Sequence, residues 1–145
     1  MMPQGALVTR TKATNFERFA GAFIDGVILL PIYFGVAFVT ATISVYLAPA
    51  VVSIIGAAWW LLRDAKHLSI GKKVMGLEVI SKSGGTATED QLMKRNYTLA
   101  GGTLLGAIPM IGGLGGLINL IECILLIAKG ERYGDQMAET MVVKK

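Results

Sequence analysis

The stretch GVILLPIYFGVAFVTATISVYLAPAVVSIIGAAWWLL, residues 26–62, contains no Asp, Glu, Lys, Arg or His. A second uncharged stretch follows at residues 96–121. A run of about 18 apolar residues already predicts a transmembrane helix, and both stretches are longer than that. The sequence therefore predicts an integral membrane protein, and its 145 residues fit one domain, residues 1–145.

The 14 Lys and Arg residues fall into three blocks, at residues 1–18, 63–95 and 129–145. Basic residues in short loops favour the cytoplasmic side of a membrane. If all three blocks are cytoplasmic, each apolar region between them must enter the membrane and return. We therefore expect an all-α polytopic membrane protein with two transmembrane helical hairpins and both chain ends in the cytoplasm.

The lengths of the apolar segments leave one alternative open. The first region is expected to turn at residues 47–50, which include Pro49, and the second at Pro109 and the glycines that follow it. The pieces of the second region are short for a hydrocarbon core of about 30 Å. That region is therefore either a hairpin, re-entrant or tilted, or one kinked span that places the C-terminus outside. The expected segments are 19–46, 49–62, 97–108 and 114–128, with a cytoplasmic loop at 63–95 and a cytoplasmic tail at 129–145.

Two short segments outside the apolar regions favour β-strands. Residues 77–81 (LEVIS) contain Val and Ile, and residues 140–144 (TMVVK) contain Thr and two Val. These residue types favour strands. They could form a small cytoplasmic two-strand element, which requires an even number of crossings between them. Thr88 with Gln91 three residues later predicts the start of a surface helix with a capping box.

Charged residues in or near the apolar runs are the candidate functional residues. Asp25 follows Arg18 by seven residues, so both lie on nearly the same helix face but about 10 Å apart. Each is expected to need a partner from another segment. Glu122, with Asn119 on the same face, lies in the last apolar run, where a carboxylate is costly. Asp25 and Glu122 are either a proton or cation site or buried partners of basic side chains that fix helix assembly.

Other chemistry has little support in the sequence. The single cysteine, Cys123, excludes an intramolecular disulfide and a cysteine-based zinc site. The single histidine, His67, has no companion ligand nearby, and no nucleophile–base pair is evident. We therefore expect no enzyme activity, no metal and no cofactor. Lys72 and Lys73 lack the glycine spacing of a P-loop, and we expect them to contact anionic lipid head groups. The net charge of +4 suits such a surface better than nucleic acid.

Four stretches of the chain resemble the RDD family of small bacterial membrane proteins. They are FERFA at 16–20 with Asp25, Arg63-Asp64 followed by LSIGKKVMGLEV at 68–79, Arg95-Asn96, and RYGDQMAETMVV at 132–143. The sequence departs from the family pattern at Glu139, where the family usually has Gly, and at residues 65–67, which replace a glycine-containing turn. The resemblance implies a multi-pass protein of the bacterial cytoplasmic membrane, with Arg18, Asp25 and Asp135 as the first residues to examine and Asp64 next.

Two functions are open on these grounds. The first is a non-catalytic accessory or scaffold subunit that packs against other membrane proteins or itself. The alternative is an oligomeric transporter of protons and monovalent cations, which the resemblance implies because sodium–proton exchange has been suggested for some members. The charges expected to carry either role are Arg18, Asp25, Asp64, Arg95, Glu122 and Asp135.

Overall fold

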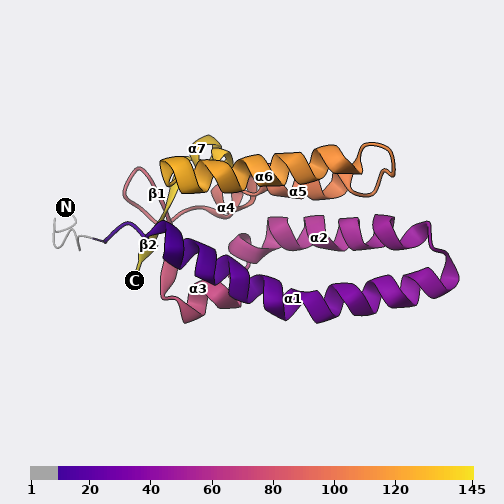
Figure 1. The fold of residues 1–145 in the computed structure, drawn as a ribbon. Coiled ribbons are helices and arrows are strands. Elements are labelled where there is room, and N and C mark those ends of the chain that lie inside the picture. The colour runs from indigo at the N-terminus through magenta and orange to yellow at the C-terminus, as the bar shows by residue number, and fades with distance from the viewer. Residues whose placement is uncertain (1–9) are drawn as a thin grey trace.

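The computed structural model describes residues 10–145 of the chain (Figure 1). Long helices run side by side, and short helices and strands gather at one end of them. The elements in chain order are α1 (Asn15–Ile43), α2 (Leu47–Ala65), α3 (Ile70–Val74), β1 (Leu77–Ser81), α4 (Glu89–Lys94), α5 (Tyr97–Leu105), α6 (Gly112–Lys129), α7 (Tyr133–Met137) and β2 (Thr140–Lys144).

Three helical segments of the described chain are long and apolar enough to cross a membrane. They are α1, the α2–α3 segment Leu47–Val74, and α6. At 1.5 Å per residue, the 29 residues of α1 extend about 44 Å and the 18 residues of α6 about 27 Å. The outward faces of these helices are apolar: Phe23, Phe34, Phe38 and Ile127 all lie well exposed on the isolated chain. Such faces suit lipid or another apolar surface far better than water.

The first chain reversal lies earlier than the sequence predicts. α1 ends at Ile43, Ser44 caps it in an extended conformation, and α2 already begins at Leu47. The turn was expected at residues 47–50, around Pro49. Pro49 instead lies in the first turn of α2, where its missing N–H removes no helical hydrogen bond.

The second apolar region also reverses direction, over residues 106–111. α5 has only nine residues, about 14 Å, and packs between α2 and α6. The glycines expected in the turn lie instead in the first turns of α6. One of them, Gly115, lies against the backbone of Gly102 in α5: an added Cβ would come within 2.0 Å of the Gly102 carbonyl oxygen. The glycine cluster therefore serves close helix packing more than the turn itself.

The short elements form a cap at the ends of the long helices, made of α3, β1, α4, α7 and β2. The two predicted strands are confirmed: they pair antiparallel, with Val79 opposite Val142. The predicted capping box is confirmed as well: the Thr88 hydroxyl accepts a hydrogen bond from the backbone N–H of Gln91, and the Gln91 side chain accepts one from the backbone N–H of Thr88. The cap contains two small apolar clusters, one around Leu77 and Val142 and the other around Ala65, Ala87 and Leu92.

Candidate functional site: a buried charged network

A network of charged side chains fills the junction between the long helices and the cap. Its members come from five different parts of the chain, and almost all of them are buried. We call this set the charged network; it consists of Arg18, Asp25, Arg63, Asp64, Ser69, Lys72, Arg95, Asn96, Arg132 and Asp135.

Asp135, in α7, is the most enclosed carboxylate of the network, with 0% of its surface exposed. It accepts hydrogen bonds from Arg95 Nη2 at 2.6 Å and Arg95 Nε at 3.0 Å. It also forms an ion pair with Arg18 of α1, and Arg132 Nη2 lies 3.5 Å from it. Three guanidinium groups from α1, the α4–α5 junction and the start of α7 therefore meet on one carboxylate.

The surroundings of Asp135 decide its charge. Burial alone would raise the pKa of Asp135, but the positive charges of Arg95, Arg132 and Arg18 outweigh burial and hold the pKa well below its ordinary value. Burial would likewise lower the pKa of Arg95, but Asp135 and Asp64 more than offset it, so that this pKa lies above its ordinary value. Both groups are charged at neutral pH.

Asp64, at the end of α2, is the second centre of the network. Its carboxylate forms an ion pair with Lys72 and accepts a hydrogen bond from Asn96 Nδ2 at 2.9 Å. Arg95 Nη1 lies 3.5 Å away and Arg63 Nε 3.6 Å away. Arg95 thus contacts both Asp64 and Asp135, which makes α2, α4–α5 and α7 one connected unit.

Asp25, in α1, is the third centre of the charged network. One of its oxygens accepts from the hydroxyl of Ser69 and lies 3.2 Å from Arg63 Nη2, and the other accepts from the backbone N–H of Gly71 at 2.8 Å. The Arg63 guanidinium also lies 4.9 Å from the ring centroid of Trp60. The carboxylate therefore fastens α3, a cap element, onto the first long helix.

Two glycines allow the backbones at this junction to touch. An added Cβ at Gly71 would lie 1.8 Å from the carbonyl oxygen of Gly21 in α1, and one at Gly134 would lie 1.9 Å from that of Arg95. Any side chain at either position would push a cap element away from the helices. The ion pairs reach their short distances because these contacts permit it.

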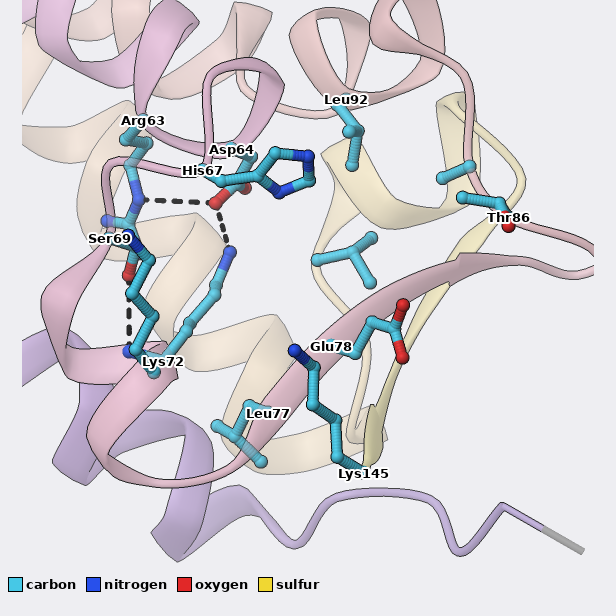
Figure 2. A pocket seen from close by; sticks show the side chains of 13 residues that line it. Arg63, Asp64, His67, Ser69, Lys72, Leu77, Glu78, Thr86, Leu92 and Lys145 are labelled. Atoms are coloured by element: carbon cyan, nitrogen blue, oxygen red, sulfur yellow. Dashed lines mark hydrogen bonds and ion pairs between the residues drawn. The ribbon is translucent and has the colours of Figure 1, made fainter. Parts of the chain in front are cut away.

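A small cavity of about 180 Å³ opens on the cap side of Asp64 (Figure 2). Figure 2 shows the Lys72 side chain running towards Asp64, with His67 beside the same carboxylate. Glu78 and Lys145 lie across the cavity from them. Lys72, expected to contact lipid head groups, is committed to this ion pair, whereas Lys73 is exposed.

Glu122 lies outside the charged network. It is 3% exposed, and its Oε2 has no hydrogen-bond partner among residues 10–145. Oδ1 of Asn119, one turn earlier in α6, also lacks a partner among these residues. Both residues line a cavity of about 300 Å³. A separate cavity of about 310 Å³ lies between α1 and α2, lined by Asp25 and by the hydroxyl-bearing Tyr33, Ser53 and Thr103.

The structure brings together five of the six charges singled out from sequence, all but Glu122. Arg18 and Asp25 do each find a partner in another segment, as expected. Sequence reasoning did not assign Asn96, Ser69 and Arg132 to the site. Asn96 and Arg132 stand beside Arg95 and near Asp135 in the motifs quoted above, and that adjacency was the available signal. Among residues 10–145, no group of three or more His, Cys, Asp or Glu is placed to hold a metal ion.

The class of protein follows from these features: a small helical protein with membrane-length apolar helices and a buried charged junction at one end. The RDD family model matches residues 12–139, and the chain belongs to the RDD family. Comparison with curated proteins and with solved structures gave no match.

The two departures from the family pattern have a structural counterpart. His67 and Glu139 are the non-glycine residues of the described chain with positive φ, at 52° each. Left-handed backbone is the conformation that glycine adopts without steric penalty. His67 and Glu139 therefore adopt backbone conformations that favour glycine, although both carry side chains.

Proposed function

We propose that this chain is a non-catalytic scaffold subunit of the bacterial cytoplasmic membrane, with the cap on the cytoplasmic side. The observation that carries the proposal is the completeness of the charged network. Asp25, Asp64 and Asp135 each have both carboxylate oxygens engaged by donors or cations. Carboxylates held in this way fix the arrangement of helices and leave no free oxygen to take up a travelling ion.

The placement in the membrane rests on the same end of the molecule. The paired strands come from residues 77–81 and 140–144, which require the middle block and the tail to lie on one face. Lys12 forms an isolated bridge with Val143, which adds the first block. All three basic blocks thus gather at the cap, the arrangement that the positive-inside rule favours for two hairpins. The apolar outer faces of α1 and α6 remain available to partner helices.

A second candidate function, exchange of protons and monovalent cations by an oligomer, is favoured by a different observation. The cavity between α1 and α2 is lined by Asp25 and by the hydroxyl-bearing Tyr33, Ser53 and Thr103. Carboxylate and hydroxyl oxygens gathered in one cavity are suitable ligands for small cations. Glu122, buried without a hydrogen-bond partner at its Oε2, is a further group that could exchange a proton.

Reconstitution separates the two functions. The purified protein is placed in liposomes, and the internal pH is followed after a sodium or potassium gradient is imposed. The scaffold proposal predicts no pH change beyond that of protein-free liposomes, together with stable co-purification of other membrane proteins. Cation-dependent flux that disappears in Asp25→Asn or Glu122→Gln, but persists in the exposed-site control Asp90→Asn, would establish the carrier and reject the scaffold.

A further inference from the structure

The helices of this protein leave a seam open between α1 and α6. α1 packs along α2, α2 along α5, and α5 along α6, whereas α1 and α6 share no extensive contact over their described residues. Figure 1 shows the two helices on opposite sides of the assembly, converging towards the cap. The cavity of about 300 Å³ lies in this seam, lined by Phe19 and Phe23 of α1 and by Glu122 and Leu126 of α6.

The lining of the cavity has two chemically distinct parts. Apolar side chains that face the seam, among them Phe19, Phe23 and Leu126, suit an acyl chain. The polar part consists mainly of cations: among the described residues that line the cavity, Glu122 is the one carboxylate. The cations that line it are Arg18, Arg63, Lys72, Arg95 and Arg132. The carboxylates of the charged network do not line this cavity, so their partners present positive charge to it.

Charge counting at the junction leaves a surplus. The five cations of the lining face four carboxylates, namely Asp25, Asp64 and Asp135 of the network together with Glu122. One positive charge is left without a counterpart. An unpaired charge in a region of low dielectric is energetically costly, and a bound group of opposite charge would stabilise it.

An occupant that completes the site must therefore carry one net negative charge and an apolar tail. The buried oxygens of Asn119 and Glu122 do not select it, because both are closed off from the cavity and Asn119 Oδ1 packs against Gly102 of α5.

We propose that the cavity between α1 and α6 binds a phospholipid with a monoanionic head group, of the phosphatidylglycerol type. Its phosphate lies among the cations of the lining, and one acyl chain follows Phe19 and Phe23. This site differs from a surface film of lipid around exposed lysines, because its cations lie in a cavity beside apolar side chains of α1 and α6. It rests on membrane insertion but not on the scaffold function.

The test uses the full chain in nanodiscs that contain equal amounts of phosphatidylglycerol, phosphatidylethanolamine and phosphatidylcholine. Lipid that stays bound after transfer to detergent is identified by native mass spectrometry. We expect phosphatidylglycerol to be retained in preference to the other two. Arg132→Gln removes the surplus charge and should lower that preference about fivefold, the effect of one basic side chain near an anionic lipid. Glu122→Gln increases the surplus and should raise the preference.

Opposite signs in these two variants distinguish binding from damage to the fold. The double variant Arg132→Gln/Glu122→Gln restores one surplus charge and should recover most of the preference. Glu131→Gln, a carboxylate of the cap surface outside the cavity lining, should change nothing. Equal retention of the three lipids, a loss in both single variants, or displacement of the lipid by soluble glycerol phosphate at similar concentrations would overturn the proposal.

Discussion

Replacing Asp135 by Asn removes one negative charge and leaves the shape of the side chain almost unchanged. The guanidinium groups of Arg95, Arg18 and Arg132 then lose their common counterion in a place with 0% exposure. Breaking a buried ion pair by removal of one partner costs about 3–5 kcal/mol, because the remaining charge stays buried without compensation. We expect the free energy of unfolding to fall by an amount in that range, and α7 to separate from the long helices.

The assay is equilibrium unfolding in mild detergent, with limited proteolysis of the cap as a second readout. Asp90→Asn, the same substitution at an exposed position of α4, serves as the control and should stay within about 0.5 kcal/mol of the wild type. Adding Arg18→Gln to Asp135→Asn should cost less than Arg18→Gln alone, since the two residues are coupled. An Asp135→Asn protein as stable as the control would refute the view that this network holds the cap in place.

Three further outcomes follow from the geometry. Gly71→Ala should destabilise the protein by about 3 kcal/mol in the same unfolding assay, because its Cβ would overlap backbone, whereas Gly26→Ala, with nothing within 4 Å of the new Cβ, should not. Glu139→Gly should raise the melting temperature by a few degrees, since it relieves positive φ at a cost of about 1 kcal/mol; an unchanged or lower value contradicts this. The pKa of Asp135 is lowered on folding. The ionised Asp135 therefore contributes its full stabilisation of the folded protein above its unfolded pKa of about 3.9, and this contribution declines as the pH falls below that value. The free energy of unfolding, measured between pH 3 and pH 7, should decline only at the acid end, and less so in Asp135→Asn.

Much of the architecture was predictable because its signals are local. The strand segments at 77–81 and 140–144 and the capping box at Thr88 depend on a few neighbouring residues, and all were located correctly. The sequence predicts the first turn too late, because proline occurs at the start of a helix as readily as at its interruption. The α5 helix ends at Leu105, three residues before its expected end, where the chain enters the loop to α6.

The charged network was predictable only in part. Helix periodicity showed that Arg18 and Asp25 need partners from elsewhere, but the partner of Arg18 lies 117 positions away, at Asp135. No local pattern specifies such a pairing. Lys72 shows the same limit: its sequence context suits an exposed lysine, and its inward direction follows from the docking of α3 against Gly21.

The proposed arrangement in the membrane requires all three basic segments to lie on one face. Single cysteines are introduced into a Cys123→Ser background. Val45→Cys reports on the turn between α1 and α2, Ser83→Cys on the cap, and Lys145→Cys on the tail. With a membrane-impermeant maleimide applied to intact cells, we predict labelling of Val45→Cys alone, and labelling of Ser83→Cys and Lys145→Cys only after permeabilisation. Labelling of Lys145→Cys but not Ser83→Cys in intact cells would place the tail and the cap loop on opposite faces and contradict the fold and the proposal together.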